Sequence, residues 1–280
     1  MSKLLKRMLE MIVLLVVVAG GLTLGMRALE PRLAFFPLTG EDVTPAQEGM
    51  PFTPHTIQTA DGERLRAWHL PAPDAVAQIV YFHGNGGNLS LWNDIVVGLA
   101  RRGFEVIAVD YRGYGLSTGA PSEQGLYRDA EATIAYVHDT LRRRELPLIY
   151  WGRSIGTAVA AHAANTRAPD GLVLEAGFPS ARSVLAGNPL MYALSYAATY
   201  RFATSESMAA VTAPALVIHG DHDSVIPYRL GQQLYETLRG PKRFVTIEGG
   251  DHNDAVPADS DTYWRAVREF AESLRRYDTP

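Results

Sequence analysis

Residues 150–165 read YWGRSIGTAVAAHAAN, and this stretch decides the fold. An apolar run ends at Trp151, the turn GRSIG follows, and an alanine-rich run begins after it. The two glycines permit a crowded turn, and the small residues behind them let a helix pack closely on a sheet. The pattern predicts a strand, a sharp turn and a helix, with the Ser154 hydroxyl exposed at the carboxyl edge of a sheet. The helix N-terminus beside it favours negative charge.

The segments around this turn alternate between β-rich and helical runs. Residues 55–71 predict two strands joined by a hairpin turn at Asp61-Gly62. Helices are expected near Ser90–Arg101 and over Glu123–Arg144. Strands separated by helix-length segments indicate βα crossovers, so the sequence predicts an α/β fold with a mainly parallel eight-stranded sheet flanked by helices. The six further strands are expected in QIVYFHG, FEVIAVD, LPLIYWG, GLVLEA, APALVIHG and RFVTIEG.

Two later loops contain a possible base for Ser154 and an acid to orient that base. A serine hydroxyl is a weak nucleophile at neutral pH and needs a base within hydrogen-bond reach. APALVIHGDHDSVIP presents Asp221 and Asp223 after a strand, and RFVTIEGGDHNDAVP presents His252 after the last strand. An open α/β sheet builds its sites at the carboxyl ends of its strands. We therefore predict Asp223 as the acid, with Asp221 as the weaker candidate, and His252 as the base.

The glycine-rich stretch YFHGNGGN (81–88) predicts donors for a developing negative charge. Its glycines allow backbone N–H groups to converge on an oxyanion, and we expect the N–H groups of Asn85 and Ile155 to do so. A phosphate cradle is the competing interpretation, but the chain has no G-x-x-x-x-G-K-[ST] motif. The stretch VDYRGYGLSTGAP is similar to a dinucleotide fingerprint, but Pro121 follows its glycines at once and no acidic ribose partner has the expected spacing.

Composition narrows the function classes. The chain has 280 residues, a formal net charge of -4 and no cysteine. The charge provides no basic field for nucleic acid, and the lack of cysteine excludes disulfides, zinc thiolate sites and a cysteine nucleophile. HGDHD is also compatible with a metal cluster, but His219 belongs to a predicted strand and no matching ligand group occurs elsewhere. GDHND is also compatible with a simple polar turn. No metal and no cofactor are expected.

The N-terminus predicts a membrane anchor over residues 1–30. Basic residues occupy positions 3, 6 and 7, and the chain is then uncharged from Met11 to Met26. Such a run approaches the length of a spanning helix, and the preceding charges favour a cytoplasmic N-terminus with the remaining chain across the membrane. A cleaved signal peptide and a buried helix of a soluble protein are the alternatives. We expect this anchor not to shape the site, and residues 31–54 to connect it to a domain over 55–280.

Residues 179–213 interrupt the alternation of strands and helices and predict a small helical lid. The segment follows the strand GLVLEA and is rich in apolar and aromatic side chains. We expect Leu190, Tyr192 and Leu194 to line an acyl pocket above Ser154. The alternative is that the segment packs onto the domain as an additional helix.

Taken together, the motifs resemble the α/β-hydrolase superfamily, and more narrowly the membrane-anchored serine hydrolases of the Bem46, ABHD13 and ABHD17 type. The matching segments run from about residue 52 to the C-terminus and are FHGNGGN, VDYRGYGLSTGAPSEQGLYRDAEATIAYV, GRSIGTAVA, PALVIHGDHDSVIP and GGDHND. The resemblance implies that Ser154 is the nucleophile, Asp223 the acid and His252 the base, in agreement with the interpretation from the residues. Members of this group include esterases and depalmitoylating thioesterases, so the resemblance does not identify a substrate.

The sequence therefore predicts a serine hydrolase that cleaves carboxylic or thio esters through an acyl-enzyme. Its expected partners are a small-molecule or lipid ester substrate and the membrane, with no nucleic acid. The oligomeric state stays open. A peptidase or an acyltransferase with the same three residues is the alternative among enzymes, and a catalytically idle, membrane-tethered binding protein is the alternative from another class.

Overall fold

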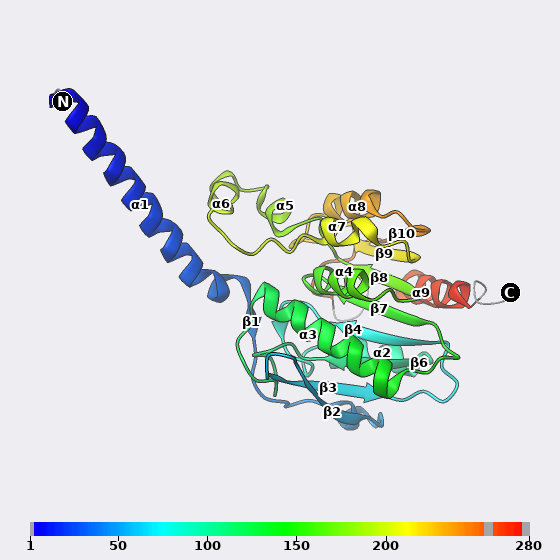
Figure 1. The fold of residues 1–280 in the computed structure, drawn as a ribbon. Coiled ribbons are helices and arrows are strands. Elements are labelled where there is room, and N and C mark those ends of the chain that lie inside the picture. The colour runs from blue at the N-terminus through cyan, green and yellow to red at the C-terminus, as the bar shows by residue number, and fades with distance from the viewer. Residues whose placement is uncertain (1–2, 255–259, 276–280) are drawn as a thin grey trace.

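An eight-stranded β-sheet forms the centre of the protein in the computed structural model, which describes residues 3–254 and 260–275 (Figure 1). The strand order is β10-β9-β8-β7-β4-β6-β3-β2. Neighbours from β10 to β6 are parallel, whereas β3 pairs antiparallel with β6 and with β2. The predicted mainly parallel eight-stranded sheet is confirmed. Its strands are β2 (Thr53–Gln58), β3 (Arg64–Leu70), β4 (Ala77–Phe82), β6 (Phe104–Val109), β7 (Leu148–Arg153), β8 (Gly171–Glu175), β9 (Ala215–Gly220) and β10 (Lys242–Ile247).

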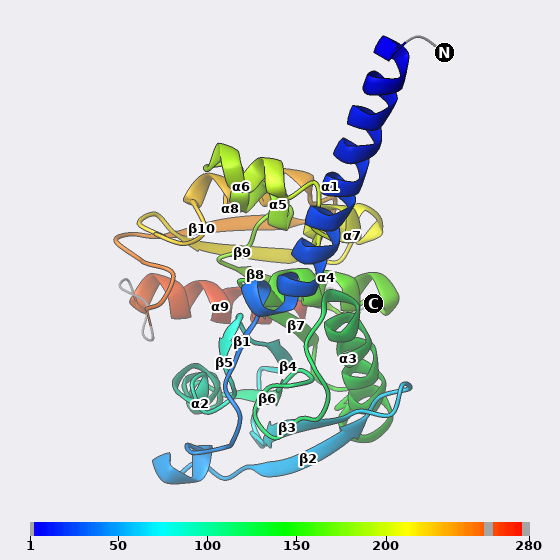
Figure 2. The ribbon, with the colours of Figure 1, turned by 90° about the vertical axis from the view of Figure 1, so that its left-hand side faces the viewer.

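Helices cover both faces of this sheet. Helices α2 and α9 lie on one side, and α3 and α4 lie on the other (Figure 2). The central strands β4, β6, β7 and β8 are buried at every position, as expected for parallel strands that helices cover on both faces. Residues of α8 belong to the same buried cluster as those of α3 and α4. The helices are α2 (Asn93–Arg101), α3 (Glu123–Tyr136), α4 (Gly156–Thr166), α8 (Tyr228–Thr237) and α9 (Ser260–Leu274).

Two predicted boundaries differ from the structure. The hairpin β2–β3 turns near Asp61-Gly62 as expected, but β2 begins at Thr53, inside the predicted connector. Helix α3 ends at Tyr136 and continues as one π-helical turn, Val137–Leu141, short of the predicted end at Arg144. The Gln78 side-chain amide donates to the Leu141 carbonyl (2.7 Å), and this contact fixes the chain as it leaves the helix.

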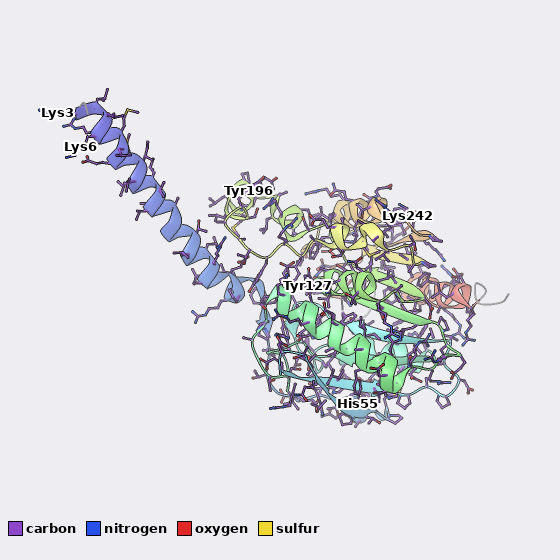
Figure 3. All side chains as sticks on the ribbon, viewed as in Figure 1. Lys3, Lys6, His55, Tyr127, Tyr196 and Lys242 are labelled. Atoms are coloured by element: carbon purple, nitrogen blue, oxygen red, sulfur yellow. The ribbon has the colours of Figure 1, made fainter. Side chains whose placement is uncertain are left out.

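Helix α1 (Lys3–Ala34) projects away from the domain, with Lys3 and Lys6 at its far end (Figure 3). It is the one helix in the described residues that is long and apolar enough to cross a membrane. It extends past the predicted anchor boundary at residue 30 into the predicted connector. The remaining connector contains β1 (Phe36–Pro37), which pairs with β5 (Gly86–Gly87), and the 3₁₀ turn Pro45–Glu48. Positions 1–2, 255–259 and 276–280, parts of the predicted anchor and domain, lie outside the described residues.

Residues 179–213, here called the lid segment, form short helices between β8 and β9. Ser180 and Asn188 cap the first two of these helices by accepting backbone N–H hydrogen bonds at their N-termini. In both ribbon views the second helix lies near α1, on the side of the domain from which α1 departs (Figure 1, Figure 2). The helices are α5 (Ala181–Leu185), α6 (Pro189–Leu194) and α7 (Thr204–Ser207), followed by the 3₁₀ turn Met208–Ala210.

The close packing of α4 on β4 yields the first prediction, because a Cβ added at Gly156 would lie 2.1 Å from the Phe82 carbonyl oxygen. Gly156→Ala should destabilise the domain by about 1–3 kcal/mol or more, as overpacking against backbone does. At Gly98 in α2 the nearest atom would be 3.6 Å away, so Gly98→Ala should be neutral or stabilise by up to about 1 kcal/mol. Thermal unfolding of both variants in detergent measures the difference. Equal midpoints for both variants would contradict it.

Candidate active site

Ser154 lies at the sharp turn between β7 and α4, in a backbone conformation that few residues other than glycine adopt. Its φ is 55°, in the left-handed region, and its N–H donates to the Glu175 carbonyl (2.9 Å). A Cβ at Gly152 would lie 2.1 Å from the Gly156 carbonyl oxygen, so the chain can turn this tightly only with glycine there. The turn places the Ser154 hydroxyl at the carboxyl end of the sheet, but Ser154 is only 8% exposed and so is not open to solvent as expected.

A chain of hydrogen bonds joins Ser154, His252 and Asp223. His252 follows β10, and its Nε2 lies 3.0 Å from the Ser154 Oγ. Its Nδ1 lies 2.7 Å from Oδ2 of Asp223, which follows β9. Because a carboxylate only accepts hydrogen bonds, we assign the ring hydrogen to Nδ1, which leaves Nε2 free to accept the serine proton. The weaker candidate, Asp221, instead contacts the exposed His222 ring (2.7 Å) and the N–H of Gly249 (2.8 Å).

The Asp223 carboxylate is almost completely buried and has several donors. The N–H groups of Val225 (3.0 Å) and Ile226 (2.6 Å) donate to its Oδ1, and His219 Nε2 lies 3.2 Å from its Oδ2. Burial raises the pKa of Asp223, but the hydrogen bonds from His219 and His252 outweigh burial and hold this pKa well below its usual value. Asp223 is therefore charged at neutral pH and can stabilise a positive His252 ring.

The predicted oxyanion donors belong to two chain segments that meet near Ser154. Ile155 follows it directly at the N-terminus of α4, and Asn85 lies in the loop between β4 and β5. This loop approaches closely, since a Cβ added at Gly84 would be 3.6 Å from the Ser154 Cβ. The Tyr114 hydroxyl donates to the Asn85 carbonyl (2.9 Å) and thereby helps to fix the loop. Asn85 and Ile155 both line the cavity described next.

A cavity of about 730 Å³ opens over Ser154 and His252, within the usual size range of ligand sites. Of the three lid residues that were expected to line an acyl pocket, Leu194 lines this cavity, whereas Leu190 and Tyr192 do not. Leu190 is 68% exposed, and Tyr192 packs edge-on against Tyr196 with ring centroids 5.6 Å apart. Successive side chains of a helix point in different directions, so the short helix α6 directs only part of its apolar residues inward. Other lid residues that line the cavity are Ala181, Val184, Leu185, Met191, Ser195, Ala198, Tyr200 and Phe202.

Helix α1 also lines this cavity, through Met26, Glu30, Leu33 and Ala34. The expectation that the N-terminal segment leaves the site unshaped is therefore wrong. The physical reason is that α1 runs on as a regular helix into the domain, where its last turns meet the lid segment.

Comparisons with known proteins agree with this architecture. A family model described as "Serine aminopeptidase, S33" matches residues 73–202. The protein Rv2307c of Mycobacterium tuberculosis is 33% identical over 271 residues, 94% of this chain and 95% of its own length. The yeast membrane protein YNL320W is 30% identical over 81% of this chain and 82% of its own length. The lysophosphatidylserine lipase ABHD12 of Danio rerio is 29% identical over 69% of this chain and 60% of its own length.

A solved esterase of Pyrococcus furiosus has the same fold. It superposes with a TM-score of 0.69 at 16% identity, covering 86% of this chain and 98% of the esterase. The chain belongs to the α/β-hydrolase superfamily. In this α/β-hydrolase the fold is combined with a long apolar N-terminal helix.

Two residues that support this α/β-hydrolase site were not predicted. The buried Arg153 guanidinium donates to the carbonyls of His252 (2.9 Å) and Asp254 (3.1 Å), so it fixes the loop that presents the histidine. His219 lies beneath Asp223, and its Nε2 also lies 2.9 Å from the Ile226 carbonyl. Because both partners of this nitrogen are acceptors, it carries the ring hydrogen. The only sequence signal of Arg153 is its position directly before Ser154, and that of His219 is its position at the end of a strand.

In the described residues no group of three or more His, Asp or Glu is arranged to hold a metal ion.

The lowered pKa of Asp223 yields the second prediction, a pH-dependent stability. Unfolding returns this pKa to about 3.9, so Asp223 stabilises the fold above that pH, and the stabilisation is lost as the pH falls toward the lower folded-state pKa. The wild type should therefore unfold at a higher temperature than Asp223→Asn at pH 7, and the gap should narrow between pH 5 and pH 3. Asp74→Asn, in an exposed turn, is the control for a lost charge. A gap that stays constant on acidification would contradict this account.

Proposed function

We propose that this protein is a serine hydrolase that cleaves carboxylic or thio esters through an acyl-enzyme formed on Ser154. The observation that supports this proposal most is the hydrogen-bonded series from Ser154 through His252 to the buried Asp223, at the floor of a largely apolar cavity. A hydroxyl, a neutral imidazole acceptor and a charged carboxylate in this order are what nucleophilic acyl transfer requires.

In the proposed mechanism Ser154, His252 and Asp223 each have one role, set by their places in the hydrogen-bonded series. His252 Nε2 removes the proton of Ser154 as Oγ attacks the acyl carbonyl carbon. The Asp223 carboxylate keeps the imidazole oriented and stabilises the imidazolium that forms. His252 then protonates the leaving oxygen or sulfur, and the ester bond breaks to leave the acyl group on Ser154. A water activated by His252 attacks this acyl-enzyme and releases the acid.

The negative charge of each tetrahedral intermediate needs donors that are already in place. We assign this role to the backbone N–H groups of Ile155 and Asn85, which lie next to Ser154 and across from it. The α4 N-terminus adds a partial positive charge at the same point. The steps use no metal and no organic cofactor, because the chain's own groups take up every proton and charge that the reaction moves.

An esterase and a peptidase with these three residues differ in the leaving group, which is an alcohol or thiol for the esterase and an amine for the peptidase. The description of the matching family model favours a peptidase. The three residues can act on esters, thioesters or amides, and an acyltransferase would replace water with another acceptor. The apolar cavity and the names of the esterase and lipase similar to this chain support esters. A p-nitrophenyl ester and the matched p-nitroanilide compare the two activities directly. A lack of reaction with a fluorophosphonate probe would instead support a catalytically idle binding protein.

We propose further that α1 anchors the enzyme in a membrane as a single pass. Its length and apolar composition support this, as does the likeness to a yeast membrane protein. Lys3, Lys6 and Arg7 favour a cytoplasmic N-terminus, so the domain would face the opposite side.

The third prediction concerns Ser154. Ser154→Ala should reduce ester hydrolysis by about 10⁴-fold or more and abolish fluorophosphonate labelling, because the nucleophile is lost while the fold is retained. Ser273→Ala, on α9, is the matched control and should behave as the wild type. A Ser154→Ala protein that retains a tenth of the wild-type rate would exclude Ser154 as the acylated residue.

The fourth prediction separates the two neighbouring aspartates. Asp223→Asn should reduce kcat by about 10⁴-fold, because an amide donates toward Nδ1 and favours the wrong imidazole tautomer. Asp221→Asn should change kcat less than about twofold, since Asp221 contacts His222 and Gly249 and not His252. Steady-state kinetics on a soluble acetate ester give both values. The reverse order would mean that the wrong carboxylate has been assigned.

A further inference from the structure

The last turns of α1 are part of the wall of the substrate cavity. Met26, Glu30, Leu33 and Ala34 line the cavity, and their spacing of i, i+4, i+7 and i+8 places them on one face of the helix. At a rise of about 1.5 Å per residue this face covers roughly 12 Å of helix. Leu24, by contrast, is 68% exposed and does not line the cavity.

Glu30 joins this face of α1 to the lid segment. Glu30 is only 6% exposed, and its carboxylate accepts hydrogen bonds from the N–H groups of Thr199 (2.8 Å) and Tyr200 (2.7 Å) and from the Thr199 hydroxyl. A buried carboxylate is stable only when such donors satisfy it, so the lid segment and α1 are held together at this point. Because the lid donors occupy the carboxylate oxygens, the helix face can present a mainly apolar surface to the cavity.

The end of α1 is also bonded to the loop that contains Asn85. The Asn85 side-chain amide donates to the Ala34 carbonyl (2.7 Å), and β1 pairs with β5 directly beyond it. Phe35 packs against the rings of Tyr200 and Phe202, with centroids 5.4 and 6.0 Å away. Helix α1 therefore contacts both the lid segment and the loop whose Asn85 N–H we assign as a donor to the oxyanion.

The uncharged part of α1 ends where the cavity begins. The uncharged run of the helix ends at Met26, which is the first of its residues to line the cavity. At the rim, Leu33 and Leu91 are each 62% exposed, and Met191 of α6 is 41% exposed. Tyr196 lies at the outer edge of the lid segment, on the side from which α1 leaves (Figure 3). Exposed apolar residues gathered around an opening indicate contact with a membrane or a ligand.

We propose that the Met26–Ala34 face of α1 is the acyl-binding wall of the site and its access path from the bilayer, so that the substrate is a long-chain ester resident in the membrane. The proposal rests on the esterase function and the membrane anchor proposed above. An acyl chain that leaves the bilayer through water exposes every methylene, at a cost that grows with chain length. A chain that moves along α1 and beneath α6 exchanges lipid contacts for contacts with the protein.

The chain has no native cysteine, so a single introduced thiol can obstruct this path selectively. Full-length Met26→Cys and Leu24→Cys, the latter as the matched control on the opposite face, are labelled in detergent with a bulky sulfonated maleimide and reconstituted into vesicles. Each sample is assayed on p-nitrophenyl acetate in water and on a palmitoyl ester of glycerol in the bilayer. The unlabelled variants report whether the substitution alone affects either rate.

Labelled Met26→Cys should lose a factor of kcat/KM on the palmitoyl ester that is at least about tenfold larger than its loss on acetate, whereas labelled Leu24→Cys should lose activity on neither substrate. Glu30→Gln, which weakens the contact with the lid segment, should raise KM for the palmitoyl ester by a larger factor than KM for acetate. Glu10→Gln, in the exposed part of α1, is its control and should leave both values unchanged.

The outcomes separate this inference from the proposed function. If the wild type neither hydrolyses acetate nor reacts with a fluorophosphonate, the esterase function fails, and the inference fails with it. If the wild type is active but the label at Met26→Cys slows both substrates equally or neither, the access path alone is overturned. The palmitoyl ester can be supplied either as monomers in water without detergent or within vesicles. If it is hydrolysed equally well in both cases, the substrate does not reach the site from the bilayer.

Discussion

The backbone of Ser154 is held in a strained conformation, and the rest of the site depends on what holds it there. A residue with a side chain at a φ of 55° costs free energy, so the turn persists only because the surrounding structure determines it. The hydrogen bond from its N–H to Glu175 fixes the turn to β8, and the buried alanines of α4 fix the helix to the sheet. The close approach of α4 to the end of β4 brings the loop of Asn85 toward Ser154. One packing contact therefore sets the position of the nucleophile and of its expected oxyanion donors.

The second requirement is a charged carboxylate inside the protein. Asp223 is surrounded by the rings of His219 and His252 and by the N–H groups of its own loop. These donors replace water, so the carboxylate stays ionised and can stabilise a positive charge on the neighbouring His252 ring. Arg153 fixes the His252 loop through two carbonyls and is itself close to Glu175 (3.6 Å) and to the face of Trp92. The charges below the site are thus arranged in pairs, and the cavity above them is left largely apolar.

The sequence predicted the elements whose signals are local. The sheet strands are short apolar runs bounded by turns, and Ser154, Asp223 and His252 follow three of them, so their approach at one edge of the sheet could be expected. The contacts of Glu30 could not be predicted from the sequence, because its partners Thr199 and Tyr200 are 169 and 170 residues away and lie in a segment with no regular pattern. Leu190 and Tyr192 were wrongly expected in the cavity for a related reason. Composition indicates that a short helix has an apolar face, but only its packed orientation decides which residues point inward.

Helix α1 contacts the walls of the cavity and so differs from a simple tether. A tether that merely holds an enzyme near a membrane can be exchanged for another tether, because none of its residues contacts the site. Here a carboxylate of α1 is buried against the lid segment, and a carbonyl of α1 accepts a hydrogen bond from Asn85. Any tilt of the helix is transmitted to both walls of the cavity, since neither contact can be stretched by more than a few tenths of an ångström without being lost. The orientation of α1 therefore affects the geometry of the site itself, and in the membrane-anchored enzyme that we propose the bilayer would fix this orientation.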